Sequence, residues 1–225
     1  MRRNYERDLP RGYTMVEVID AKDLKFGLIL TLGALLLFAV ALVPVFIPLF
    51  FGYKDAIFDA FLKSSDLIML TYFGGTLLYM VLHELTHGAV YKSMTGEKLT
   101  FGISWNCAYC GVPNIYTYRK TALAALYAPF ILFSVLLIPA TALAFYFGVL
   151  WLYIALGLIF ATHISGCIGD LYMGRLLRRK YTSVTTLIND NGPCVRVFTF
   201  DPSNIDSEDA ATKRFADRLS GKYKY

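Results

Sequence analysis

Four long apolar stretches are the feature that most constrains how this chain can fold. They cover approximately residues 26–51, 67–94, 122–147 and 149–175. A bilayer core about 30 Å thick is crossed by about 20 helical residues, so each stretch is long enough to form one span. The sequence therefore predicts an all-α transmembrane fold with about four spanning helices and a tight turn between the third and the fourth.

The composition agrees with a membrane protein. Of the 225 residues, 56% are hydrophobic and 17% are charged, whereas soluble domains are about one half apolar and about one quarter charged. The net charge of +5 comes from basic residues beside the apolar stretches and not from a separate basic module with interleaved aromatic side chains. We therefore expect the lipid bilayer as a partner, and no nucleic acid.

The polar segments divide the chain into three expected parts. Residues 1–25 are polar and lack the pattern of a cleavable signal peptide, so we expect the first apolar stretch to remain as a helix. The expected parts are a cytoplasmic N-terminal segment over residues 1–25, a four-helix membrane domain over residues 26–177 and a cytoplasmic tail over residues 178–225.

The basic residues indicate the orientation of the spans. They gather before the first span, between the second and the third, and after the fourth, at Arg2, Arg3, Arg7, Arg11, Lys22, Lys25, Lys92, Lys98, Arg119, Lys120, Arg175, Arg178, Arg179 and Lys180. The loop after the first span has only Lys54 and Lys63. The positive-inside rule therefore places both termini and the loop over residues 95–120 in the cytoplasm. The expected location is the cell membrane, as a multi-pass protein of a bacterial plasma membrane.

Two polar segments have the pattern of β-structure. Lys98–Tyr118, between the second and third spans, is rich in β-forming and turn residues and predicts a small hairpin folded back against the spans. Its Cys107 and Cys110 form a lone C-x-x-C pair, which favours a turn with reduced thiols over a structural zinc site. In the tail, Cys194–Phe200 alternates like a strand, and Ser207–Leu219 predicts a short helix.

The second apolar stretch carries a His-Glu-x-x-His motif in its C-terminal half. His83 and His87 are four residues apart, so on a helix they share one face and can reach one metal ion. Glu84 lies one position round the helix, where its carboxylate can take a proton from a water molecule activated by zinc. Ionisable residues inside a span are costly, so the motif predicts a Zn²⁺ site and not a chance match.

A catalytic zinc site needs a third protein ligand, and the fourth stretch offers two. His163 and Asp170 lie at the depth of the motif when residues are counted along the two spans at about 1.5 Å each. We favour Asp170 as the third ligand and His163 as its supporting partner or a substrate contact, with exchanged roles as the alternative. The simpler explanations are an ion pair between Asp170 and Arg175, and packing for His163. Gly166 and Gly169 would let the two spans approach closely.

These residues carry a family resemblance. His83–Gly88 (HELTHG), the stretch from Tyr118-Arg119-Lys120 to Ala128-Pro129, and Ser165–Asp170 (SGCIGD) resemble the bacterial membrane proteins called putative zincin peptidases. The chain is also similar to the site-2 protease type of intramembrane metalloprotease, although it lacks an Asn-Pro before an Asp-Gly pair and a PDZ-like module. The resemblance implies that His83, His87 and Asp170 bind zinc and that Glu84 is the catalytic base.

The predicted function is that of a zinc-dependent intramembrane endopeptidase. It would hydrolyse peptide bonds of a membrane protein or peptide substrate through water activated by the metal. The alternative is a non-catalytic membrane protein, either a metal-binding scaffold or a small transporter, in which the polar cluster is structural or binds cargo. Transporters commonly contain internal repeats, and this sequence shows none.

Overall fold

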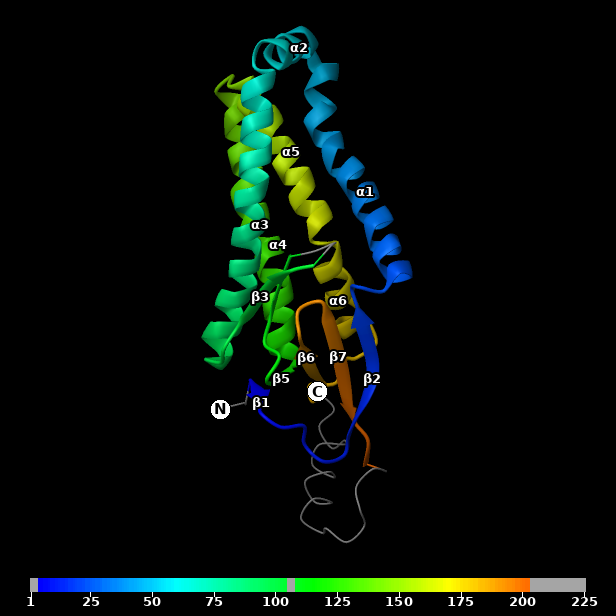
Figure 1. Ribbon diagram of the computed structural model, residues 1–225. Helices are drawn as coiled ribbons and strands as arrows, with labels where there is room; N and C mark the ends of the chain where they lie inside the picture. Colours follow the sequence, from blue (N-terminus) through cyan, green and yellow to red (C-terminus); the bar gives the residue numbers. More distant parts are fainter. Residues whose placement is uncertain (1–3, 105–107, 203–225) are drawn as a thin grey trace. The chain divides into compact units, whose positions relative to one another are not determined.

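The computed structural model describes residues 4–104 and 108–202 (Figure 1). By its internal contacts the chain forms two compact units. The first, which we call the membrane unit, consists of Gly27–Thr86 and Tyr127–Tyr172. The second, which we call the sheet unit, consists of Met1–Phe26, His87–Leu126 and Met173–Tyr225.

The expectation of four spanning helices is confirmed in length and composition. The helices are α1 (Leu24–Phe46), the 3-10 helix η1 (Ile47–Phe51), α2 (Lys54–Lys63), α3 (Ser65–Thr95), α4 (Arg119–Tyr146), α5 (Leu150–Gly166) and α6 (Ile168–Arg179). Within the described residues, four helical segments are long and apolar enough to cross a membrane: Leu24–Phe51, Ser65–Thr95, Arg119–Tyr146 and Leu150–Arg179. The short helix α2 was not foreseen.

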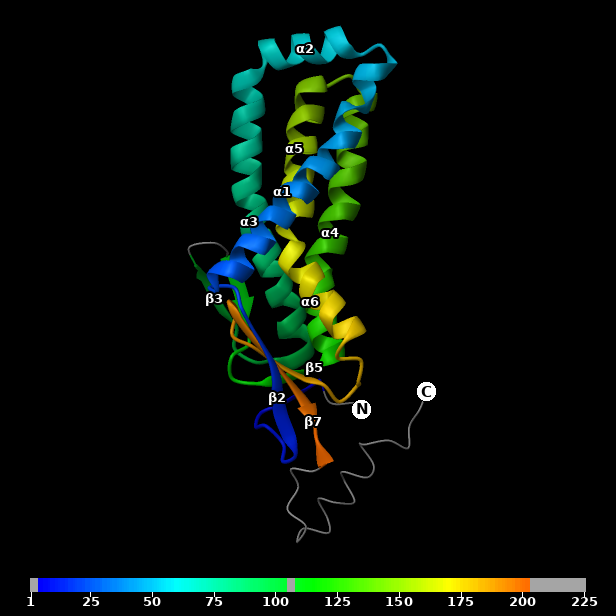
Figure 2. The same ribbon diagram turned by 90° about the vertical axis from the view of Figure 1, so that its right-hand side faces the viewer.

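The membrane unit is held together by close contacts between small and branched residues. Gly157 of α5 faces Val45 of α1, and a Cβ atom at this glycine would lie 2.7 Å from a methyl group of the valine. The Tyr153 hydroxyl of α5 donates a hydrogen bond to the Val45 carbonyl at 2.8 Å. These contacts join α1 to α5, while α2 lies across the ends of α1 and α3 (Figure 2).

The turn between α4 and α5 is as tight as the sequence predicts. Gly148 has a φ of +71°, which glycine adopts without the steric cost of a Cβ atom. The Val149 N–H donates to the Ala144 carbonyl at 2.9 Å, which closes the C-terminal turn of α4. The next helix, α5, begins directly afterwards at Leu150.

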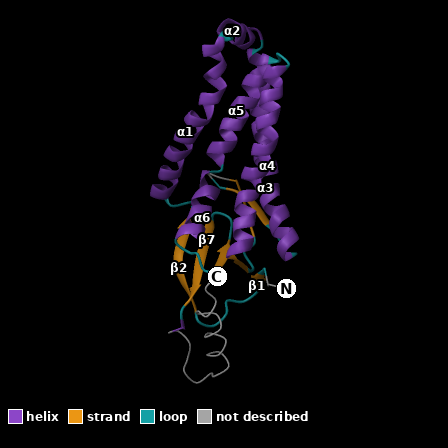
Figure 3. Cartoon of the chain, turned by 180° about the vertical axis from the view of Figure 1, so that it is seen from behind, coloured by secondary structure: helices purple, strands orange, loops and turns teal. Residues whose placement is uncertain are grey.

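The all-α expectation is wrong, because the structure contains two antiparallel sheets (Figure 3). In spatial order the larger sheet consists of β1 (Tyr5–Glu6), β5 (Tyr116–Tyr118), β6 (Leu187–Asp190), β7 (Cys194–Phe200) and β2 (Tyr13–Asp20). The smaller sheet is the hairpin of β3 (Thr100–Ile103) and β4 (Ala108–Gly111). The predicted hairpin and the predicted strand over Cys194–Phe200 are therefore confirmed. The predicted helix Ser207–Leu219 lies outside the described residues.

The larger sheet forms because segments far apart in the sequence pair. β2 runs antiparallel to β7 from Tyr13 opposite Phe200 to Asp20 opposite Cys194. All four residues of β6 are buried. The core beside the sheet combines strand residues with residues of α4, of α6 and of the loop after α6: Ala122, Met173, Leu177, Tyr181, Ile188 and Val197. The sheet thus belongs to the hydrophobic core of its unit.

Candidate metal centre

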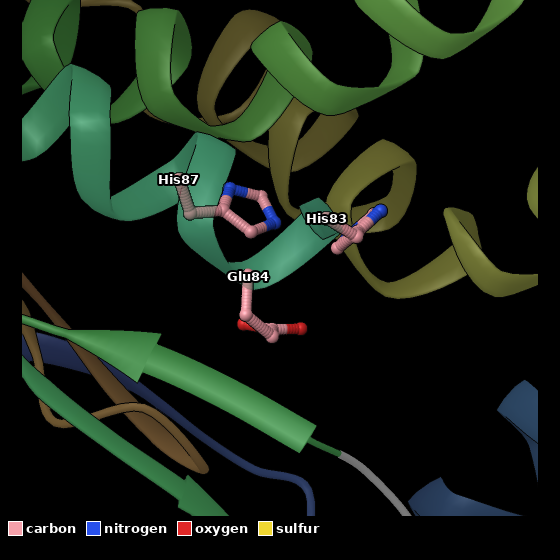
Figure 4. Close-up of side chains that lie close together, drawn as sticks. All are labelled: His83, Glu84 and His87. Atoms are coloured by element: carbon pink, nitrogen blue, oxygen red, sulfur yellow. The ribbon is translucent and has the colours of Figure 1, made fainter. Parts of the chain in front are cut away.

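The His-Glu-x-x-His motif lies on α3, which is continuous from Ser65 to Thr95. One ligand atom each from His83, Glu84 and His87 lie within 4.8 Å of one another. The three side chains leave neighbouring positions of the same helix (Figure 4). Both histidines are buried, and Glu84 is half-buried. The helical spacing therefore brings the motif's donor atoms together as expected.

Within the membrane unit, Asp170 contacts the first histidine of the motif. Nε2 of His83 lies 3.2 Å from Oδ2 of Asp170, and these side chains are 10% and 17% exposed. Two nitrogen or oxygen ligands about 2.0–2.1 Å from a tetrahedral zinc ion are separated by about 3.3 Å. The observed separation and the donor types therefore fit a shared zinc ion.

The position of Asp170 depends on a break in the fourth span. This span is not one helix, because α5 ends at Gly166 and α6 begins at Ile168, with Cys167 between them. Asp170 consequently lies in the first turn of α6, where a carboxylate is favoured by the helix dipole. His163, near the end of α5, and Asp170, in the first turn of α6, thus lie on two helices where the sequence predicts a single span.

His163 is fully buried and its ring lies between two hydroxyl groups. Its Nδ1 is 3.0 Å from the Tyr79 hydroxyl, and its Nε2 is 3.1 Å from the Ser134 hydroxyl. The same Tyr79 hydroxyl lies 2.9 Å from Nδ1 of His83. The Tyr79 hydroxyl therefore connects His163 to His83.

Sequence reasoning missed Tyr79 and Cys167. Tyr79 precedes His83 by four residues, so it occupies the same helix face one turn earlier. Cys167, His83 and Asp170 form a second group whose ligand atoms lie within 4.8 Å of one another. The Cys167 sulfur is 3.6 Å from Nδ1 of His163. Their spacing from His83 and Asp170 was the only sequence signal for a role at the site. Their residue types gave none, because a tyrosine or a cysteine in an apolar helix usually indicates packing.

His87 is oriented by the backbone of α4. Its Nδ1 lies 2.9 Å from the Ala125 carbonyl, and since a carbonyl only accepts, Nδ1 must carry a proton. In a regular helix this carbonyl would accept from the N–H of residue 129. That residue is Pro129, which has no N–H. The proline therefore makes the carbonyl available, and with the proton on Nδ1 a neutral His87 ring would bind a metal ion through Nε2.

The β3–β4 hairpin packs against α3 beside the motif. A Cβ atom at Gly88 would lie 2.8 Å from the Phe101 ring, 3.0 Å from Leu99 and 3.3 Å from the Cys110 sulfur. Cys110 is a buried cysteine in β4, and Cys107 lies outside the described residues. The glycine that follows His87 thus permits the close approach of the hairpin.

Residues 76–184 match the model of a family described as putative zincin peptidase. The matched segment is a little under half of the chain, and it contains every candidate residue of the site. No curated protein and no solved structure matches the chain. The match supports a zincin-like family and a zinc metallopeptidase.

Proposed function

We propose that this chain is a zinc-dependent intramembrane endopeptidase. The observation that carries the proposal is the distance of 3.2 Å between Asp170 Oδ2 and His83 Nε2. His83 lies on α3, the helix that also bears Glu84 and His87. The family match supports zinc peptidase chemistry. The four helices long and apolar enough to cross a membrane support a site that acts on membrane-associated substrates.

Three residues would hold the zinc ion: His83, His87 and Asp170. A set of two histidines and one carboxylate is typical of catalytic zinc, which leaves a coordination position for water or substrate. Zinc bound there supplies a Lewis acid that polarises a peptide carbonyl and lowers the pKa of a water molecule. In each histidine, Nδ1 contacts another group, so Nε2 would be the atom that binds the ion.

Glu84 would move the proton. Its carboxylate takes one proton from the attacking water, whose oxygen forms a bond to the carbonyl carbon. The same carboxyl group then gives this proton to the leaving amide nitrogen as the C–N bond breaks. The products are a carboxylic acid, which loses its remaining proton to the solvent, and an amine, so the reaction consumes only water and needs no other reactant.

The membrane placement completes the proposal. Both termini and the β3–β4 hairpin would lie on the cytoplasmic side of the cell membrane, according to the distribution of basic residues. The hairpin packs beside Gly88, one residue after His87. An extended segment of a membrane protein could add to the edge of this hairpin by backbone pairing and thereby reach the motif.

A non-catalytic metal-binding scaffold is the second candidate, and one observation favours it. Cys167 is fully buried, and its sulfur lies within 4.8 Å of ligand atoms of His83 and Asp170. With His87 these residues would make four protein ligands, which is the number found in structural zinc sites. If the protein is a peptidase, Cys167→Ser should still cleave substrate. If it is a scaffold, Cys167→Ser should bind zinc more weakly, and neither the wild type nor any variant should cleave.

The test of the peptidase is Glu84→Gln, with Glu97→Gln, two residues beyond the end of α3, as the control. Wild type and variants are produced in bacterial membranes, and new peptide N-termini are labelled and identified by mass spectrometry. We expect N-termini that appear with wild type and Glu97→Gln but not with Glu84→Gln, while all three proteins bind zinc equally. The same N-termini with all three proteins would contradict the proposal.

A further inference from the structure

A row of polar side chains, buried except for the half-buried Ser134, extends from His83 within the membrane unit. Tyr79 of α3 contacts His83 at 2.9 Å and His163 of α5 at 3.0 Å, and His163 contacts Ser134 of α4 at 3.1 Å. Three helices therefore meet in one hydrogen-bonded row. Its polar groups lie within spanning helices, where polar groups without partners are costly.

We propose that Tyr79, His163 and Ser134 are positioning residues that fix the tautomer and the orientation of His83 for zinc. This inference rests on the proposed function, because it takes His83 Nε2 as a zinc ligand. A ring that binds zinc through Nε2 carries its proton on Nδ1. Ligating histidines usually donate that proton to an oxygen, which holds the ring in place.

The donors of the row then have one consistent direction. Nδ1–H of His83 donates to the Tyr79 oxygen, and the Tyr79 O–H donates to Nδ1 of His163. His163 therefore carries its proton on Nε2 and donates it to the Ser134 oxygen. Each group donates once along the row, so neutral His163 acts as an acceptor for the tyrosine and not as a zinc ligand.

The rings around the row hold Tyr79 independently of its hydroxyl. The Tyr79 ring packs edge-to-face on the rings of His83, His163 and Phe133, with centroids 5.5, 5.4 and 5.1 Å away. Tyr79→Phe keeps these contacts and removes only the oxygen. The substitution therefore isolates the hydrogen bonds from the packing.

The chain offers a matched control on the same pair of helices. The Tyr72 hydroxyl of α3 contacts the Thr162 hydroxyl of α5 at 3.2 Å. Tyr72 lies two helical turns before Tyr79, and Thr162 directly precedes His163. Tyr72→Phe also removes one hydroxyl bond between α3 and α5. If the bonds only joined the helices, both substitutions would have the same effect.

The experiment measures zinc affinity of the full chain in detergent by competition with a fluorescent chelator. We expect Tyr79→Phe to weaken zinc binding about 10- to 100-fold, the usual cost of losing a partner of a metal ligand, and Tyr72→Phe to leave it unchanged. The absorption bands of the cobalt-substituted protein should shift only in Tyr79→Phe, since they report the arrangement of the ligands.

Two further variants test the acceptor role of His163. Asparagine places a polar group near the position of Nδ1, so His163→Asn should retain more zinc affinity than His163→Leu, and both should still reach one zinc at saturation. Equal affinity in wild type, Tyr79→Phe and His163→Leu would overturn the inference and leave the peptidase proposal standing. Absence of zinc from the wild type would overturn both.

Discussion

Pro129 gives a sharp test of how the fold prepares His87. Because proline has no N–H, the Ala125 carbonyl lacks its usual helical donor and accepts from His87 Nδ1 at 2.9 Å. Pro129→Ala restores the missing donor on α4. The restored helical bond competes with His87 for the same carbonyl, so the imidazole should be held less firmly.

The expected loss follows from the strength of one hydrogen bond. A neutral hydrogen bond contributes about 1 kcal/mol net, and a carbonyl has two lone pairs, so the contact with His87 is weakened and not abolished. A loss of about 0.4–1 kcal/mol corresponds to a two- to fivefold fall in zinc affinity. Competition with a fluorescent chelator resolves a change of this size.

Pro139→Ala in the same helix is the control. It also restores a helical donor, whose partner is the Val135 carbonyl, so it reproduces the change in α4 without touching His87. We expect its zinc affinity to equal that of the wild type. If Pro129→Ala binds zinc as tightly as Pro139→Ala, the proposed role of the proline is refuted.

Three further predictions concern packing and pH. Gly157→Ala should lower the melting temperature of the purified protein, because its Cβ would lie 2.7 Å from Val45 and overpacking costs about 1–3 kcal/mol; Gly74→Ala, which meets no atom within 4 Å, should not. Gly88→Val should displace the β3–β4 hairpin and reduce cleavage while zinc content stays at the wild-type level; unchanged cleavage would exclude a role for the hairpin. Hydrogen bonds from Lys180 and Tyr181 lower the pKa of Glu17, so its stabilisation is present above the carboxyl's ordinary pKa and is lost as pH falls through the lowered value. An acid titration should show this loss in wild type and not in Glu17→Gln, and identical titrations would contradict it.

The spans could be predicted because hydropathy acts over contiguous residues. The larger sheet could not, although β2 alternates partly and was within reach of a strand prediction. Its neighbour β7 lies about 180 residues away in the sequence, and such pairing leaves no local signal. All four residues of β6 are buried, so the alternation that marks a half-exposed strand is absent there.

The site shows the same division between local and distant information. The motif was readable because His83 and His87 are one helical turn apart. Counting depth along the spans led to Asp170, which the structure places 3.2 Å from His83, and its role as a ligand remains a prediction. Cys167 was missed because only the folded arrangement brings its sulfur near His83. Tyr79 was missed although it lies one helical turn from His83, because a tyrosine in an apolar helix usually indicates packing.

The most direct test of the central claim is the zinc content of the detergent-purified chain after metal reloading. Mass spectrometry should find about one zinc per wild-type chain, and the same in Cys167→Ser. Asp170→Ala and His83→Ala should lose it. A full zinc content in Asp170→Ala, or no zinc in the reloaded wild type, would contradict the account.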